Sequence, residues 1–524
     1  LSGNTATKPK WADSLTSVNL NSVGSDQYRV NDFIRAGYTG GGRAFSVYSG
    51  DDVRQAIDTI LSSAVGTGKD AGVAVSGNSG QFQSLDGQTK YTTEYNTADN
   101  TGDLKAYELD SNGGYKTLSG GVPVPLWSAD QKMPAVTGRK IFSLSGYDAN
   151  SPNTAASLRQ ELNYNTKLST VPSDFSALLN SDGLQKTDET FIRYMLGQDG
   201  LTNTLNAPYR IRNQPIAASV NSPPAFVGGR INMGYDTYGS VNGQATYASY
   251  RTQKQTLPAT IFSATNEGKV HVINGAATDT AVTVAGVNVP AGAELASFMP
   301  KNAMSEQISL ADPAFRFRYI LDGPLVDADV YDSGNKTPAG STPAWRQLVF
   351  GTGGRATRNF MFGLESPLNA SDRVPTKNNF LWEADSSTTG YGDLAKISNN
   401  PTAGQLDDGT WVMLTGSGHY GGAGKQVGLY VVNAFNGKLV KFIPLPSSYN
   451  NTATTMVNRG LGGVVAVRDT NRNIVAAYAG DANGNLWRFD LRTAHFVVSY
   501  NKPLFTTPAG SGQPIYATPA WQAH

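Results

Sequence analysis

Short stretches of alternating apolar and polar residues recur along the chain, each linked to a glycine-containing turn. The clearest example is YAGDANGNLWRFDL (478–491). Here an apolar run is followed by a turn rich in Gly, Asp and Asn, and a second alternating stretch with Leu486, Trp487 and Phe489 comes after the turn. Alternation with period two predicts β-strands, and such turns predict tight hairpins. The plan recurs in GDLKAYEL (102–109), TNEGKVHVIN (265–274), NFMFGL (359–364) and GLYVVN (428–433). These repeats predict an all-β fold, a β-propeller with at least five blades.

Helical periodicity is confined to a few places. Residues 51–61 predict one helix in an otherwise irregular N-terminal segment (1–70), which is followed by the propeller (71–524). An insertion at about 150–205 is expected to be partly helical, with its best helices at 155–162 and 189–196 and with Phe191, Met195 and Leu196 facing inward. A further blade is expected to begin within 513–521.

Composition narrows the function classes. The chain has 524 residues, 57 of them Gly, with 16% charged residues and a net charge of +1, so neither nucleic acid nor an anionic membrane is an expected partner. It contains no Cys, which excludes disulfides, thiol catalysis and zinc–thiolate sites. No apolar run is long enough to predict a membrane span. The Asn, Thr, Ser and Gly content is typical of an exported bacterial surface protein, and because Leu1 starts no signal peptide we expect a mature or excised piece.

One loop has the spacing of a calcium ligand set. Asp469, Asn471 and Asn473 stand at its first, third and fifth positions, and the backbone carbonyl of Val475 falls at the seventh. Short oxygen side chains at alternate positions open an EF-hand-like loop. The alternative is an Asx-rich hairpin turn without a metal, because one carboxylate and two amides compensate a divalent charge poorly.

A second acidic group lies at Asp327, Asp329 and Asp332. The first two share one face of a predicted strand, where an ion would relieve their repulsion; the alternative is a solvated strand edge. Arg210 and Arg212 predict a structural salt bridge, or else an anchor for a carboxylate.

Catalytic motifs are missing from the sequence. The four histidines (His271, His419, His495 and His524) are scattered and match no metalloprotease spacing; each is expected to be a packed or surface residue. Residues 351–354 lack the Lys and Ser/Thr of a phosphate loop, and 407–409 predict a hairpin turn. Six tryptophans are expected to pack between blades, with a sugar-binding platform as the alternative: Trp127, Trp345, Trp382, Trp411, Trp487 and Trp521.

A series of segments taken in order resembles the C-terminal domain of the PilY/PilC family, the tip-associated adhesins of type IV pili. The resemblance covers roughly residues 28–524; each segment alone is a generic blade fragment, whereas the ordered set is specific. The segments are FIRYMLGQDG (191–200), YRIRNQPIAASVNSPPAFVG (209–228), SATNEGKVHVING (263–275), ILDGPLVDADVY (320–331), WRQLVFGTGGRATRNFMFGLE (345–365), LDDGTWVMLTGSGHY (406–420) and YAGDANGNLWRFDL (478–491).

This resemblance implies a modified quinoprotein-like propeller of about seven blades and a non-enzymatic adhesin and assembly factor. It implies roles in pilus biogenesis, twitching motility and attachment to host or abiotic surfaces. Minor pilins and the pilus tip complex would be the partners, and the location would be exported: the pilus tip, cell surface or outer membrane.

The sequence departs from the family in several places. The family's N-terminal von Willebrand-type module is absent from this chain, no Arg-Gly-Asp tripeptide occurs, and the Gly-Asp expected near Ala217 is missing. Ala477 stands at the ninth position of the 469–475 loop, where the family has an acid, so calcium is expected to bind weakly or not at all.

Two alternative functions stay open at this point. A quinoprotein-like dehydrogenase would need a calcium and a catalytic Asp beneath the quinone; no such cluster is evident, and no quinone is expected. A glycan-binding propeller is permitted by the aromatic residues.

Overall fold

The computed structural model divides into two compact units, Leu1–Asp70 and Ala71–His524, and only the second is described, together with Asp70. The helix expected at 51–61 lies outside the described residues. The described ranges are 70–76, 88–110, 114–119, 122–149, 158–175, 189–202, 208–229, 232–237, 239–279, 282–284, 287–334, 342–368, 373–421, 424–450 and 460–522.

Five sheets of four or six strands make up the described part of the chain, numbered here 1 to 5. Sheet 1 has the order β1 (Asp70–Ser76), β2 (Gln88–Asn96), β3 (Thr101–Leu109), β6 (Trp127–Ser128). Sheet 2 has the order β8 (Arg159–Leu162), β7 (Ile141–Leu144), β14 (Glu294–Phe298), β11 (Lys269–Asn274), β10 (Thr260–Thr265), β9 (Ala225–Val227).

The other three sheets follow in chain order. Sheet 3 is β15 (Leu325–Asp332), β16 (Ala344–Thr352), β17 (Phe360–Ser366), β18 (Phe380–Asp385). Sheet 4 is β19 (Thr402–Gln405), β20 (Trp411–Gly416), β22 (Gly428–Asn433), β23 (Leu439–Pro444). Sheet 5 is β21 (Gly418–His419), β24 (Gly460–Arg468), β25 (Ile474–Asp481), β26 (Asn485–Asp490), β27 (Val497–Val498), and β28 (Phe505–Thr506) also pairs with β26.

The remaining elements are short. Two hairpins stand apart from the large sheets: β4 (Leu118–Ser119) with β5 (Val122–Pro123), and β12 (Val282–Val284) with β13 (Val287–Val289). The helices are α3 (Ala129–Lys132), α5 (Thr190–Met195), α6 (Gln244–Gln255), α7 (Lys301–Met304) and α8 (Gln307–Ala311), with 3-10 turns η3 (Val136–Gly138), η5 (Leu168–Thr170), η6 (Lys377–Asn379), η7 (Ser499–Asn501) and η8 (Gly510–Gly512). No helix among the described residues combines the length and the apolar character needed to cross a membrane.

The hairpin motifs of the sequence fall one to a sheet. The stretches 102–109, 265–274, 359–364, 428–433 and 478–491 contribute strands to sheets 1 to 5 in that order. Sheets 3 and 4 are antiparallel four-stranded meanders, the form of a propeller blade. The expected β-propeller architecture is therefore confirmed. The described part of the chain holds five large sheets, two of which have this simple four-stranded form, whereas the resemblance implies about seven blades.

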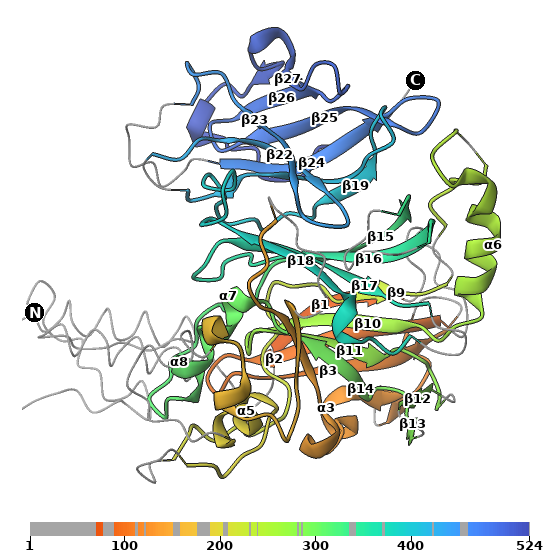
Figure 1. The fold of residues 1–524 in the computed structure, drawn as a ribbon, viewed down its shortest axis with the longest axis vertical. Helices are drawn as coiled ribbons and strands as arrows, with labels where there is room; N and C mark the ends of the chain where they lie inside the picture. Colours follow the sequence, from red (N-terminus) through yellow and green to blue (C-terminus); the bar gives the residue numbers. More distant parts are fainter. Residues whose placement is uncertain are drawn as a thin grey trace, which may run out of the picture. The chain divides into compact units, whose positions relative to one another are not determined.

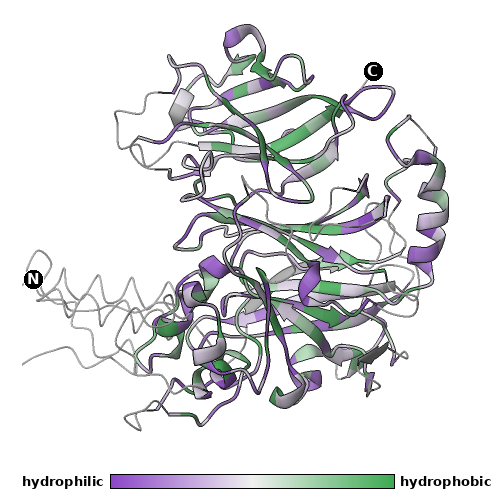
Figure 2. Cartoon of the chain, viewed as in Figure 1, coloured by the Kyte–Doolittle hydropathy of each residue, from purple (hydrophilic) through white to green (hydrophobic). Residues whose placement is uncertain are grey.

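Consecutive sheets share hydrophobic cores: one core lies between sheets 3 and 4 and another between sheets 4 and 5, and Figure 1 shows sheet 3 below the strands of sheets 4 and 5. Because side chains alternate across a strand, each inner sheet buries both faces: Trp411 and Met413 of β20 pack toward sheet 3, whereas Val412 and Leu414 pack toward sheet 5. Figure 2 shows apolar strands inside and a mainly polar α6 on the outside. Five of the six tryptophans are buried in these cores as predicted; Trp521 is 43% exposed, so for this residue the prediction is wrong.

The 150–205 insertion is only partly as expected. Helix α5 forms within the predicted 189–196, and Phe191, Met195 and Leu196 are buried against Met304 and Leu310 of α7 and α8. Arg159–Leu162, predicted helical, is instead the strand β8, because it pairs with β7 at the edge of sheet 2.

The last predicted blade start is also wrong. Residues 513–521 form no strand; the Ile515 amide donates to the Asp481 carbonyl (3.0 Å), so this segment lies along sheet 5.

Candidate functional site

The 469–475 loop joins β24 to β25 as a closed turn. The Asp469 amide donates to the Asn473 carbonyl (2.9 Å). The Asp469 carboxylate in turn accepts the amides of Asn471 and Asn473, both at 2.9 Å. This is the geometry of an Asx turn, in which the side chain replaces backbone partners.

The oxygens predicted to bind calcium have other hydrogen bonds in this turn. The Asn473 side-chain oxygen accepts from Gln405 Nε2 (2.8 Å), and the Val475 carbonyl accepts from the Leu491 amide (3.0 Å). Within the described ranges, no three acidic or histidine side chains gather closely enough to hold a metal. These oxygens are therefore not arranged as a preformed calcium site. That calcium binds here weakly or not at all stays a prediction.

The acidic strand is not a solvated edge. Asp329 on β15 is 2% exposed, and its carboxylate accepts hydrogen bonds from Tyr247 (2.6 Å), Tyr250 (2.7 Å) and Lys254 (2.8 Å) of α6. These three residues share one face of the helix, which thereby fastens α6 to sheet 3. The carboxylate is already neutralised by Lys254, so neither alternative from the sequence, an ion or a solvated edge, describes it.

Asp327 lies two residues earlier on the same face of β15. Burial, and then the neighbouring Asp329 charge, raise the pKa of Asp327 to about 7. Asp332, the third member, is fully buried and lies 3.6 Å from Arg346.

A second buried charge network lies in sheet 2. Glu267 contacts Arg212 (2.6 Å), Lys269 (2.9 Å) and His271 (2.7 Å). The other imidazole nitrogen of His271 lies 2.6 Å from Glu294, which also pairs with Arg139 at 2.8 Å. The salt bridge expected for Arg212 is thus present, whereas Arg210 donates to the Leu310 and Asp99 carbonyls.

The protonation states of His271 and Lys269 depend on their burial and on the neighbouring carboxylates. Burial opposes a charge on His271, but hydrogen bonds to Glu267 and Glu294 outweigh it and raise the histidine pKa. Burial lowers the pKa of Lys269 to about 8 against the attraction of Glu267. The acidic and basic side chains are 0–5% exposed, so no substrate can reach them, and the network serves to hold the fold.

The remaining histidines with described surroundings have ordinary structural positions. His419 is 9% exposed, neither ring nitrogen has a hydrogen-bond partner among the described residues, and burial lowers its pKa to about 4. His495 is exposed and lies 3.0 Å from Asp490. Neither forms part of a catalytic arrangement.

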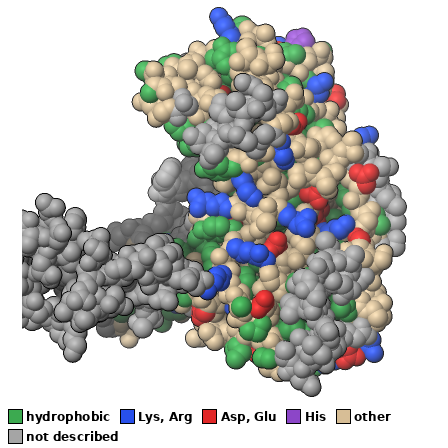
Figure 3. Space-filling model, turned by 90° about the vertical axis from the view of Figure 1, so that its left-hand side faces the viewer, with side chains coloured by type: hydrophobic (Ala, Val, Ile, Leu, Met, Phe, Trp, Pro, Cys, Tyr) green, Lys and Arg blue, Asp and Glu red, His purple; other side chains and the backbone are tan. Residues whose placement is uncertain are grey.

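Charged side chains are unevenly spread on the face drawn in Figure 3, where Lys and Arg gather across the middle of the molecule with a few acidic side chains among them. The chain as a whole carries a net charge of only +1, which does not favour a polyanionic partner.

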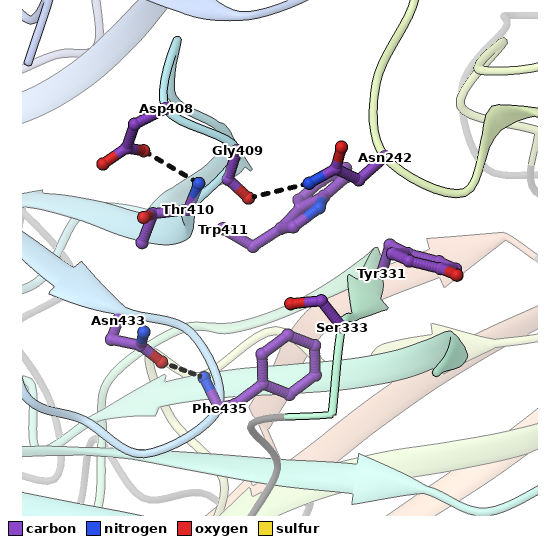
Figure 4. Close-up of a pocket in the computed structure, with 9 residues that line it drawn as sticks. All are labelled: Asn242, Tyr331, Ser333, Asp408, Gly409, Thr410, Trp411, Asn433 and Phe435. Carbon is purple, nitrogen blue, oxygen red and sulfur yellow. Dashed lines mark hydrogen bonds between the residues drawn. The ribbon is translucent and has the colours of Figure 1, made fainter. Parts of the chain in front are cut away.

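A small cleft of about 210 Å³ opens between sheets 3 and 4 (Figure 4). Its walls come from the loop before α6, the end of β15, and the turns that flank β20 and follow β22. Nine residues line it: Asn242, Tyr331, Ser333, Asp408, Gly409, Thr410, Trp411, Asn433 and Phe435. Sequence reasoning named Asp408, Gly409 and Trp411 as turn or packing residues and assigned the others no role, because the nine residues meet only after four separate segments fold together.

Comparison with known proteins gives the family. The model of the PilY1 beta-propeller domain matches residues 216–512, more than half of the chain. A type IV pilus biogenesis factor PilY1 homolog of Xylella fastidiosa is 27% identical over 91% of this chain and 33% of its own length. The type IV pilus biogenesis factor PilY1 of Pseudomonas aeruginosa strain UCBPP-PA14 is 26% identical over 88% of this chain and 36% of its own.

Among solved structures, the Pseudomonas aeruginosa PilY1 C-terminal domain matches with a TM-score of 0.40 and 22% identity, covering 56% of each chain. The present chain thus spans about a third of the length of these two curated relatives. The family model covers the part of the chain that forms most of sheets 2 to 5. This chain therefore belongs to the PilY1 β-propeller domain family.

Proposed function

We propose that this chain is the propeller of an exported type IV pilus biogenesis factor, and that it acts without catalysis as an adhesin and assembly factor at the pilus tip. The observation that carries the proposal is the family match across residues 216–512, together with the pilus biogenesis role named for the curated relatives. Partners would be the minor pilins of the tip complex and a host or abiotic surface.

The chemistry of the described residues supports a non-enzymatic role. The titratable clusters around Asp329 and Glu267 are closed to solvent, and both carboxylates are paired with buried basic side chains. The only acid lining the open cleft, Asp408, has no second acid or base among the nine lining residues. A mechanism that uses a general acid and a general base together would need both groups within reach of a substrate.

The partner claim is tested with purified components. The 524-residue chain is immobilised and exposed separately to each minor pilin of the source bacterium and to its major pilin. We expect at least one minor pilin to be retained and the major pilin to pass through. Failure of every minor pilin to bind would refute the proposed assembly contact.

The adhesin claim needs a separate measurement, because loss of pili also abolishes attachment. Attachment to epithelial cells and to plastic is compared between strains matched for surface pilin, one with and one without the propeller. We expect lower attachment without it at equal piliation. Equal attachment would refute the proposed adhesive role and leave only the role in pilus assembly.

The dehydrogenase alternative is tested by spectroscopy. The chain is mixed with pyrroloquinoline quinone and calcium and assayed for a protein-bound quinone band and for dye reduction with simple alcohols. We expect neither. A bound band with turnover would overturn the non-enzymatic proposal.

A further inference from the structure

The cleft between sheets 3 and 4 combines two kinds of surface. Tyr331, Trp411 and Phe435 supply aromatic rings, while Asn242, Asp408, Thr410 and Asn433 supply amide, carboxylate and hydroxyl groups around the opening. Figure 4 shows Asn242 and Trp411 at one wall and Phe435 and Ser333 at the other. Aromatic surface with a few fixed polar groups is the general form of a small-molecule site.

The polar rim is held in place before any ligand arrives. The Asn242 amide N–H donates to Gln405 Oε1 (2.8 Å), and its side chain donates to the Gly409 carbonyl (3.4 Å). The Asp408 carboxylate accepts the Thr410 amide at 2.9 Å, and the Asn433 side chain accepts the Phe435 amide at 3.0 Å. Such preorganisation lowers the entropic cost of binding.

The turn at Gly409 depends on glycine. Its φ is +87°, and an added Cβ would come within 2.7 Å of Asn242 Nδ2. Glycine suits this position mainly because side chains rarely adopt such a φ, and a larger residue would also displace the Asn242 side chain from the Gly409 carbonyl.

The wall of the cleft that contains Asn242 also carries a buried donor, the indole N–H of Trp411. Trp411 is 4% exposed, and its indole N–H has no hydrogen-bond partner in the described part of the chain. The ring is held by Trp345 and Tyr235, at centroid distances of 5.5 and 5.4 Å. Buried donors are normally paired. The indole nitrogen is itself covered, so an acceptor bound in the cleft would reach it only after a small shift of the ring.

Charge and size restrict the ligand. The nine lining residues include one acid, Asp408, and no Lys, Arg or His, which disfavours phosphates, nucleotides and carboxylates. The volume of about 210 Å³ lies below the usual range for drug-sized ligands or peptides. What remains is a compact, uncharged molecule with hydroxyl groups for the amides and carboxylate, and with an apolar C–H face for the rings.

We infer that this cleft binds a single neutral sugar ring, a hexose or an N-acetylhexosamine at the end of a glycan. The inference rests on the proposed adhesive function and supplies a ligand class for it. Vicinal hydroxyls would meet Asn242, Asp408 and Asn433, while the C–H face of the ring would lie against Tyr331, which is only partly buried.

The test uses the full 524-residue chain and methyl glycosides of glucose, galactose, mannose, N-acetylglucosamine and N-acetylgalactosamine. Saturation-transfer NMR and calorimetric titration measure binding. We expect at least one of these sugars to bind, at least tenfold weaker binding in Asn242→Ala and in Asp408→Ala, and unchanged melting curves.

Asp407→Ala is the matched control. Asp407 belongs to the same turn, but its carboxylate accepts from Thr493 (2.7 Å) and does not line the cleft, so binding should persist. Absence of binding to all five sugars would overturn the inference, and so would binding that survives both cleft substitutions. A glycan array carrying mammalian glycans and bacterial polysaccharides then distinguishes the source of the sugar.

Failure here is separable from failure of the proposed function. Sugar binding is measured on the isolated chain, whereas the assembly role is measured by pilin binding. If the chain binds minor pilins but no sugar, only the inference that the cleft binds sugar is refuted.

Discussion

Substituting Lys254 by Met should destabilise the propeller strongly, because Lys254 neutralises a carboxylate that water cannot reach. Lys254 Nζ lies 2.8 and 2.9 Å from the two oxygens of Asp329, and the side chains are 0% and 1% exposed. Methionine keeps an unbranched side chain of nearly the same length but removes the ammonium group. Breaking a buried ion pair on one side costs about 3–5 kcal/mol of unfolding free energy.

A second substitution should restore part of this loss. In the double variant Lys254→Met/Asp329→Asn the buried carboxylate charge is gone. The amide oxygen still offers an acceptor to Tyr247 and Tyr250, which in the unchanged chain donate to Asp329 at 2.6 and 2.7 Å. We expect the double variant to be more stable than Lys254→Met by about 2 kcal/mol.

Urea unfolding followed by tryptophan fluorescence measures both effects. Gln253→Ala, at an exposed position of the same helix, is the control and should change stability by less than about 0.5 kcal/mol. A loss below about 1 kcal/mol in Lys254→Met would refute the reasoning, as would a double variant whose loss equals the sum of the two single losses.

Three further outcomes follow from the structure. Trp487→Ala should cost about 3–5 kcal/mol, because this fully buried ring packs between sheets 4 and 5 and donates to Asp481 (2.8 Å); an unchanged melting temperature would contradict this. Burial lowers the pKa of His419 to about 4 in the folded state, so the unfolded chain binds the proton more readily. The contribution of His419 to the free energy of unfolding is therefore highest above pH 6.5 and should fall by about 3 kcal/mol as the pH is lowered to 4. His419→Phe should therefore lose less stability than the parent chain between pH 7 and pH 4 in urea titrations, and parallel losses would exclude the effect. Calcium should bind to the chelator-stripped chain no tighter than roughly 10⁻⁴ M, and calorimetric binding tighter than about 10⁻⁵ M that vanishes in Asp469→Ala would show a working site.

The blades were predictable because their signal is local. Stretches such as 428–433 and 478–491 combine period-two alternation with Gly, Asn and Asp turns; the first forms the strand β22 and the second the hairpin of β25 and β26. Helix α5 was predictable for the same reason, from the spacing of Phe191, Ile192 and Met195.

What sequence reasoning missed depends on distant partners. Asp329 is neutralised by Lys254, 75 residues earlier, so its strand alone resembles a solvated edge. Arg159–Leu162 follows a helical pattern, but Arg159 is buried against sheet 3, where it donates to the Phe380 and Leu381 carbonyls (both 2.9 Å). Glu267, Lys269 and His271 stand at every second position of one hairpin, and these charged residues on one strand face were a signal for the sheet 2 network. Glu294 and Arg139 carried no such signal, because they come from distant parts of the chain.

The proposed role in pilus biogenesis is tested most directly by the amount of pilin on the cell surface. Residues 71–524 are deleted in frame from the gene of the source bacterium, in a strain that cannot retract its pili, and pilin sheared from the cells is quantified by immunoblot. We predict a clear loss of surface pilin that is restored by the intact gene. Surface pilin equal to that of the parent strain, with the shortened factor still produced and exported, would contradict the proposed role of this propeller in pilus assembly.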